Sequence, residues 1–156
     1  MTTPLDLKGK ERAQGVQNMF SKIAPNYDLM NRIMTAGQDI RWRKEVIRRA
    51  KLDKNDSLLD LGAGTGDIAR EGLKQHPTIY ALAADFTLEM MRAGKKDTHL
   101  HWSSVDALNL PFPDKSFDAI VSGFLMRNVT DVPRALKEQY RALKPGGRIV
   151  ILDTTK

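Results

Sequence analysis

At 156 residues, with 41% hydrophobic and 28% charged residues, the chain has the size and composition of one soluble globular domain. It contains no cysteine, which excludes disulfides and thiolate chemistry and fits a cytoplasmic location. No apolar run approaches the roughly 20 residues that span a bilayer. The formal net charge of +6 predicts attraction to an anionic surface, either lipid headgroups or nucleic acid.

The first fifty residues are predicted to be a loose tail followed by helices. Residues 1–9 are polar and predict a flexible tail. In the third expected helix, over residues 40–50, Asp39 is expected to be the N-cap and Ile40 to face inward. We interpret residues 10–51 as a helical lid over a binding site. The three helices are expected over residues 10–23, 26–34 and 40–50.

From residue 52 onward, short apolar runs alternate with helical patterns, which is typical of repeated βαβ units. Residues 52–156 are therefore predicted to form an α/β domain with a mostly parallel sheet. Strands are expected over residues 57–61, 78–84, about 98–103, 117–123 and 148–152. Helices are expected over residues 67–75, 87–94 and 131–143.

A glycine-rich stretch follows the first predicted strand. Residues 60–66 read D-L-G-A-G-T-G, which predicts a strand ending in a carboxylate, a tight turn and a helix that begins near Asp67. Glycines let the backbone approach a ligand closely, and a helix N-terminus offers unpaired N–H groups. The dinucleotide fingerprint would require glycine at position 67. Because Asp60 and Asp67 would repel a pyrophosphate, the stretch favours a cationic ligand instead.

A second acid, Asp85, ends the next predicted strand about 20 residues beyond the turn. A carboxylate there can accept hydrogen bonds from both hydroxyls of a ribose, although Asp85 could also simply cap the helix that begins near Thr87. Asp106 follows the third strand, where it could accept from the exocyclic amine of adenine or act as an ordinary turn aspartate. Phe86 could pack on the ribose or adenine face, or in the core.

Four stretches carry a resemblance to a known family. Residues 60–66 resemble the first motif of class I S-adenosylmethionine (SAM) methyltransferases, and the other stretches are similar to signatures of the ubiquinone/menaquinone biosynthesis C-methyltransferases. The resemblance covers about residues 16–153. Leu125 departs from it, because members of this family commonly have glycine at that position. The stretches besides 60–66 are residues 19–31 with Gly37 and Trp42-Arg43, residues 124–131, and residues 143–148.

The resemblance implies a fold and a cofactor. The fold is a Rossmann-like class I methyltransferase sheet behind N-terminal helices, with five strands present and the last two of the usual seven missing. Strand 148–152 would then be an unpaired apolar edge, and we expect a second chain or self-association to cover it. The cofactor is SAM. The predicted cofactor-binding residues are Asp60, Gly62, Gly64, Thr65, Gly66, Asp85, Phe86, Asp106, Ala107, Ser122 and Gly123.

The implied reaction is SAM-dependent C-methylation of a reduced quinone precursor, either a demethylmenaquinol or a related benzoquinol. Arg127 follows the fourth strand at the carboxyl edge, and we expect it to stabilise the ring oxyanion, the alternative being a surface arginine bonded to helix carbonyls. Tyr27 could contribute a hydroxyl and Asn128 could orient substrate hydroxyls; capping or packing roles are the alternatives. The sequence shows no metal-ligand constellation.

Two other functions stay open on the sequence. The chain could be a SAM methyltransferase acting on another small molecule or on RNA, or a non-catalytic SAM-binding subunit that needs a partner chain. Nucleic acid is disfavoured because no aromatic platform is interleaved with the basic residues. The basic cluster within residues 41–51 could contact anionic headgroups at the inner face of the membrane, or could be a solvated helix face.

Overall fold

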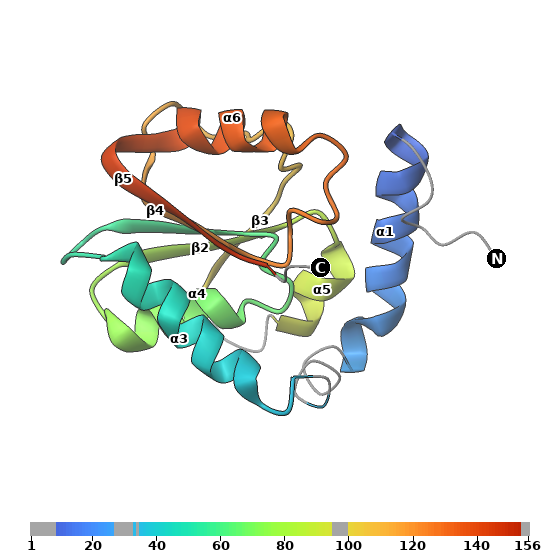
Figure 1. Ribbon diagram of the computed structural model, residues 1–156, viewed down its shortest axis with the longest axis horizontal. Coiled ribbons are helices and arrows are strands. Elements are labelled where there is room, and N and C mark those ends of the chain that lie inside the picture. The colour runs from blue at the N-terminus through green and yellow to red at the C-terminus, as the bar shows by residue number, and fades with distance from the viewer. Residues whose placement is uncertain (1–8, 27–32, 34, 95–99, 154–156) are drawn as a thin grey trace.

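The chain folds around a five-stranded sheet in which all neighbouring strands are parallel. The computed structural model describes residues 9–26, 33, 35–94 and 100–153 (Figure 1). The strands lie in the order β3-β2-β1-β4-β5, so β1 is central. The chain adds β2 and then β3 on one side of β1, and β4 and then β5 on the other side. Their bounds are β1 Ser57–Leu61, β2 Tyr80–Asp85, β3 His101–Ser104, β4 Phe117–Gly123 and β5 Leu143–Leu152.

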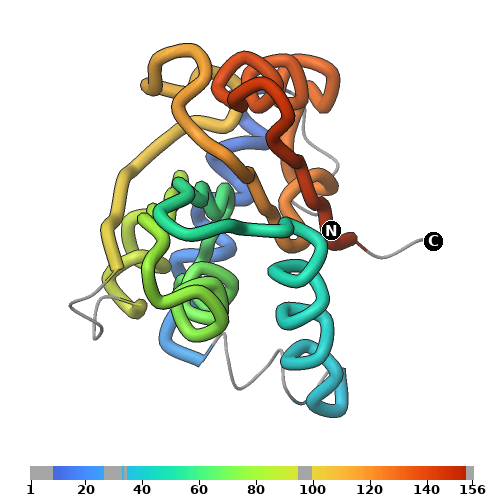
Figure 2. Tube along the Cα trace, turned by 90° about the vertical axis from the view of Figure 1, so that its left-hand side faces the viewer, coloured from blue at the N-terminus to red at the C-terminus, as the bar shows by residue number. Residues whose placement is uncertain are grey.

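Helices cover both faces of the sheet. Figure 2 shows α6 on one side and α3 with α4 on the other. Helix α1 stands beyond the carboxyl ends of the strands, close to α5 (Figure 1). The bounds are α1 Gly9–Ile23, the 3-10 turn η2 Ala24–Asn26, α3 Gln38–Ala50, α4 Asp67–Gln75, α5 Leu88–Gly94 and α6 Val132–Ala142.

The alternation of side chains along β1 explains why both faces need cover. Leu58 points into the core under α3 and α4, whereas Leu59 and Leu61 belong to the core on the α6 face. All three leucines are buried, as expected for the central strand of a parallel sheet. The polar exception is Asp60, which is fully buried on the strand between these leucines.

The predicted α/β architecture is confirmed, and the bounds of β1, α4 and β4 match the sequence expectation. Strand β5 is longer than expected, because Leu143 already pairs with Phe117 before a register shift restores pairing at Arg148. Strand β3 covers 101–104, and the earlier part of its expected range, 98–99, lies outside the described residues. The expected helix over 26–34 also lies almost wholly outside them, as does the expected tail over 1–9 apart from Gly9, which is instead the first residue of α1.

The expectation for the start of α3 was wrong. The helix begins at Gln38, after Gly37 in a left-handed conformation (φ 77°), and no side chain caps it. Asp39 lies within the first turn, where its buried carboxylate accepts from the Thr35 hydroxyl and pairs with Arg43 at 2.9 Å. Because Asp39 occupies the inward face, its neighbour Ile40 points outward and is 41% exposed.

Strand β5 forms one edge of the sheet. It pairs with β4, and within the described ranges no strand lies along its other side. Ile151 on this edge is partly exposed, which is the situation that edge strands usually avoid. That another strand covers β5 stays a prediction. None of the helices described is long and apolar enough to cross a membrane.

Close packing at the end of α5 generates a stability prediction. A Cβ added to Gly94 would collide with the Thr65 carbonyl oxygen and lie 2.6 Å from the Trp102 ring, and the backbone oxygen cannot rotate away. We expect Gly94→Ala to lower the free energy of unfolding by about 3 kcal/mol in urea melts. Gly146→Ala, which meets nothing within 4 Å but has a φ of 80°, should cost only about 1 kcal/mol. Equal losses for the two variants would contradict the packing argument.

Candidate functional site

The turn between β1 and α4 forms the floor of the site. Gly62, Gly64 and Gly66 all have positive φ, which L-residues with a side chain rarely adopt. The N–H groups of Gly62 and Ala63 both donate to the Ala84 carbonyl, at 2.8 and 3.0 Å. The turn is therefore fastened to the end of β2 at the carboxyl edge of the sheet, with Gly62 and Ala63 half-buried and Gly64 buried.

Asp60 supports the turn from below. Its Oδ2 accepts a hydrogen bond from the N–H of Ala69 at 2.9 Å, so this strand residue satisfies a backbone donor in the first turn of α4. The N-cap residue itself is Gly66, which has no side chain that could accept a hydrogen bond from the first turn of the helix. The other oxygen, Oδ1, is buried and has no hydrogen-bond partner among the described residues.

Asp85 ties the end of β2 to the same turn. Its Oδ2 accepts from the Gly64 N–H at 2.8 Å and its Oδ1 accepts from the Thr87 N–H at 2.7 Å. The bond to Thr87 is the capping interaction that the sequence left open. The bond to Gly64 joins the two acidic strand ends into one structure, and Asp85 lines the cavity described below.

These carboxyls are electrostatically unusual. Burial raises the pKa of Asp60 to about 7, with the nearby Asp85 and Asp67 adding to the rise and the Ala69 N–H opposing it. Burial also raises the pKa of Asp85, while backbone N–H groups oppose it. Arg43 from α3 ion-pairs with Asp67 and with Asp39, and Arg70 also pairs with Asp67. Asp60 and Asp85, by contrast, accept hydrogen bonds from backbone N–H groups. The site therefore favours a positively charged ligand, which would hold both buried carboxyls in their ionised form.

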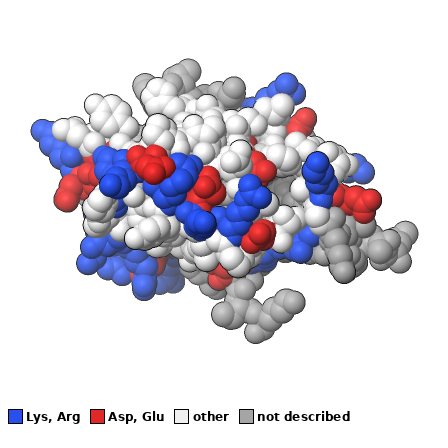
Figure 3. Space-filling view, turned by 90° about the horizontal axis from the view of Figure 1, so that it is seen from above, with Lys and Arg blue, Asp and Glu red and all other residues white. Residues whose placement is uncertain are grey.

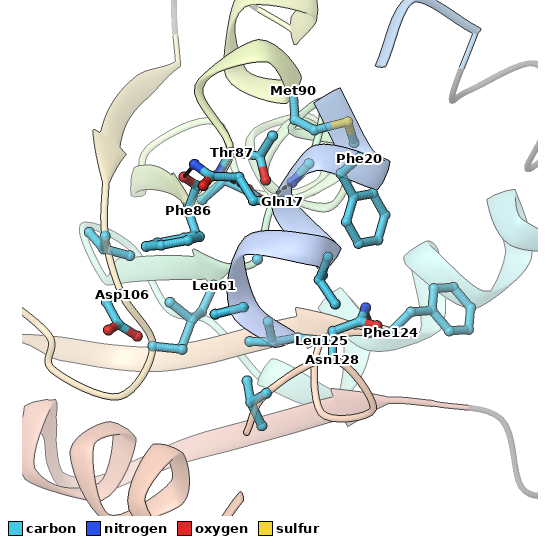
Figure 4. Close-up of a pocket in the computed structure, with 18 of the residues that line it drawn as sticks. Gln17, Phe20, Leu61, Phe86, Thr87, Met90, Asp106, Phe124, Leu125 and Asn128 are labelled. Carbon is cyan, nitrogen blue, oxygen red and sulfur yellow. Dashed lines mark hydrogen bonds between the residues drawn. The ribbon is translucent and has the colours of Figure 1, made fainter. Parts of the chain in front are cut away.

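An open cavity lies between this turn and α1 (Figure 4). The cavity and the open space at its mouth together amount to about 930 Å³. Asp106 and Phe86 lie toward one end of the view, and Phe20, Leu125 and Asn128 toward the other. The site thus has a polar end near β2 and β3 and a more apolar end near α1 and the segment after β4.

Eight of the predicted site residues line this cavity. Asp106 does so from a turn that it stabilises itself, because its Oδ1 accepts from the Leu108 N–H at 2.8 Å. Phe86 is 45% exposed, so its ring is available to a ligand rather than packed in the core. The eight are Gly62, Gly64, Asp85, Phe86, Asp106, Ala107, Gly123 and Asn128.

Other predicted residues lie behind or below the turn. Thr65 lines a smaller hollow on the far side of the turn, together with Arg43 and Asp67. Gly66 faces Trp102, and Ser122 is fully buried on β4 with its hydroxyl unpaired within the described residues. None of these is part of the main cavity, and their predicted SAM contacts stay predictions.

The segment after β4 makes a tight turn at the apolar end of the cavity. Phe124 has a φ of 58°, an uncommon conformation for a residue with a side chain. Asn128 holds this turn, because its N–H donates to the Leu125 carbonyl and its side-chain amide donates to the Phe124 carbonyl at 3.1 Å. Asn128 therefore has a structural task in addition to any contact with a substrate.

The structure does not place Arg127 among the residues that line the cavity. Its guanidinium donates to Asp153 and lies 5.0 Å from the centre of the Phe124 ring. Its carbonyl oxygen accepts from Arg12 of α1 at 2.9 Å. Within the described part of the chain, the bonds seen for this guanidinium go to a carboxylate and not to a helix carbonyl, the alternative that the sequence left open. Tyr27, the other predicted catalytic residue, lies outside the described residues.

Several residues that line the cavity were not predicted from the sequence. Gln17 lines the cavity and donates to the Phe86 carbonyl at 3.3 Å, which ties α1 to the end of β2. Thr87 and Met90 line it from the start of α5. Leu125 also lines it, and the only sequence signal was its departure from the family's glycine.

A parallel sheet ordered 3-2-1-4-5, with a glycine turn after its central strand and acids at two neighbouring strand ends, defines a Rossmann-like domain of the class I methyltransferase type. The chain belongs to the ubiE/COQ5 methyltransferase family, whose sequence profile matches residues 7–156. The resemblance inferred from the sequence motifs is thereby confirmed.

Named relatives agree with this membership. The chain is 43% identical to the ubiquinone/menaquinone biosynthesis C-methyltransferase UbiE of Desulfotalea psychrophila, over 97% of this chain and 65% of the relative. It is 39% identical to the demethylmenaquinone methyltransferase of Deinococcus radiodurans, over 92% and 62% respectively. The chain thus spans somewhat less than two thirds of the length of these relatives.

A solved structure supports the fold. Phosphoethanolamine N-methyltransferase 2 of Haemonchus contortus, in complex with S-adenosyl-L-methionine, superposes with a TM-score of 0.65 at 25% sequence identity. The match covers 71% of this chain and 27% of that one.

The raised pKa of Asp60 predicts how stability depends on pH. Folding lifts this pKa from 3.8 to about 7, so the folded chain retains a proton that the unfolded chain has lost. The resulting stabilisation is fully present below about pH 4 and is lost as pH rises through about 7. Asp60→Asn keeps an acceptor for Ala69 but cannot titrate. Urea melts at several pH values should therefore show the wild type losing a few kcal/mol relative to Asp60→Asn across this window, whereas parallel profiles would contradict the assignment.

Proposed function

We propose that this chain provides the donor site and part of the acceptor pocket of a SAM-dependent methyltransferase that methylates a ring carbon of a reduced quinone precursor. The observation that carries the proposal is the position of Asp60 and Asp85, which flank a bare glycine turn beside an apolar cavity. The names of the Desulfotalea and Deinococcus relatives support a demethylmenaquinol or a related benzoquinol as the acceptor.

The residues at the polar end fit SAM. Its sulfonium and ammonium groups are cationic, and the incompletely balanced carboxyls around the turn attract such a charge. Asp85 would accept from the ribose hydroxyls, Asp106 from the adenine amine, and the exposed ring of Phe86 would pack on the adenosine. Gly64, which lines the cavity and carries no side chain, lets the donor approach the backbone.

The apolar end fits a lipophilic ring. Val16 and Phe20 of α1 line the cavity together with Leu125 and Val129 of the segment after β4, and these side chains offer no charge to a polar acceptor such as RNA. A quinol ring with an isoprenoid tail matches such walls. The lid role that we propose for residues 10–51 rests on the same cavity-lining residues of α1.

When bound, SAM supplies an activated methyl group: the ring carbon forms a C–CH₃ bond as the S–CH₃ bond breaks, the bond pair stays on sulfur, and the proton that the ring carbon then loses passes to solvent. The protein's own tasks are to align the two ligands and to favour the oxyanion that makes the ring carbon nucleophilic. We assign the second task to Arg127, supported by Asn128 and Tyr27. The assignment is supported by the place of Arg127 in the turn whose Leu125 and Asn128 line the cavity; its guanidinium itself lies outside this lining and donates to Asp153.

Peripheral membrane contact has weaker support. Within the basic cluster of α3, Arg43 is ion-paired beside the glycine turn, and Arg48 and Arg49 both pair with Glu45. On the face over α6, Lys and Arg alternate with Asp and Glu (Figure 3). Neither surface has the single sign of charge that anionic lipid headgroups attract most strongly.

A transfer assay tests the role of Arg127. With SAM and a demethylmenaquinol, Arg127→Ala should lower kcat by about 10²–10³-fold, because an oxyanion donor acts mainly in the transition state. The Kd for SAM, measured by calorimetry, should stay within about twofold of the wild-type value. Arg49→Ala, an exposed arginine away from the cavity, serves as the matched control. Unchanged transfer by Arg127→Ala would remove this residue from the mechanism.

A further inference from the structure

Leu125 lies at the apolar end of the cavity, next to the glycine turn that faces the donor. It lines the cavity from the turn after β4, beside Phe124 and Asn128 (Figure 4). Its side chain packs directly over the glycine turn, because a Cβ built on Gly62 would lie 2.9 Å from Leu125 Cδ1. The side chain thus fills space between the turn that faces the donor and the walls that face the acceptor.

The position of this side chain is well defined by its surroundings. The N–H of Asn128 donates to the Leu125 carbonyl, and the Asn128 amide holds the preceding carbonyl of Phe124. Leu125 also packs against the buried core on the α6 face of the sheet, which includes Leu61 and Ile120. Because both backbone and side chain are held, Leu125 is a fixed wall of the cavity.

We infer that Leu125 is a specificity-determining residue, which sets how large a ring the acceptor end admits. The inference rests on the proposed function, and it names the feature of the acceptor that the chain discriminates. Fusing a second ring to a benzene ring adds as many carbons as the leucine side chain contains. Leu125→Ala removes three of these four carbons and therefore opens most of the space that distinguishes a naphthoquinol from a benzoquinol.

The test compares two acceptors with the same short isoprenoid tail, a naphthoquinol and a benzoquinol, at saturating SAM. For Leu125→Ala, the ratio of kcat/KM for the naphthoquinol to kcat/KM for the benzoquinol should rise about tenfold over wild type. Leu125→Met, which keeps the volume, should leave this ratio within about twofold. Thermal melts establish that each variant is folded.

Leu108→Ala is the matched control. Leu108 is also a partly buried leucine that lines the cavity, but it lies beside Asp106, at the opposite end. Its truncation should raise KM for SAM and leave the acceptor ratio unchanged. An unchanged ratio in folded Leu125→Ala, or an equal rise in Leu108→Ala, would overturn the assignment.

A second readout separates this inference from the proposed function. If the wild-type chain transfers no methyl group, calorimetry with the two quinones in the presence of S-adenosylhomocysteine still gives a ratio of dissociation constants. A shift of that ratio toward the larger ring in Leu125→Ala would support the role of Leu125 even though the proposed reaction had failed. The absence of a shift, or of binding by either ring, would overturn it.

Discussion

Two buried carboxylates, Asp60 and Asp85, hold this site together by accepting hydrogen bonds from backbone N–H groups. Asp60 accepts from Ala69 at the start of α4, and Asp85 accepts from Gly64 within the turn. Each bond joins a strand end to the segment that follows β1, so the acids are structural and electrostatic at once. Taking carboxylates out of water is costly, and the raised pKa values of both groups express that cost. A cationic ligand at the turn would offset it, which explains why such acids are placed beneath a ligand-facing backbone.

The topology then decides what the acids face. Because the strands are parallel, the segments that follow β1, β2 and β4 emerge at one edge of the sheet, and the central position of β1 places the glycine turn between the other two. Helix α1 crosses this edge and is fastened by polar contacts from Gln17 to Phe86 and from Ser21 to Glu89. The cavity between them is polar on the side of β2 and apolar on the side of the turn after β4. That division is the physical basis for assigning a charged donor to one end and a lipophilic ring to the other.

Much of this arrangement could be predicted from local sequence. The strand at 57–61 and the helix at 67–75 follow from a short apolar run, three alternating glycines and an amphipathic pattern, and all of that information is local. The start of α3 was misjudged because an aspartate before an apolar residue resembles an N-cap, whereas Asp39 is drawn inward by Arg43. The direction of the Arg127 side chain could not be foreseen, since its partner Asp153 is distant in sequence and is brought near only by the pairing of β4 with β5. Likewise, only the folded chain shows that Leu125 packs on Gly62.

The central claim is that the acidic strand ends bind a positively charged methyl donor. Calorimetric titration of the chain with SAM, repeated with Asp85→Asn, tests it most directly. The account predicts saturable binding of SAM to the wild type and a loss of about tenfold or more in affinity for Asp85→Asn, since a charged acceptor facing the cavity is removed. A wild-type chain that is folded but gives no heat of binding with SAM, or an Asp85→Asn variant with unchanged affinity, would contradict it.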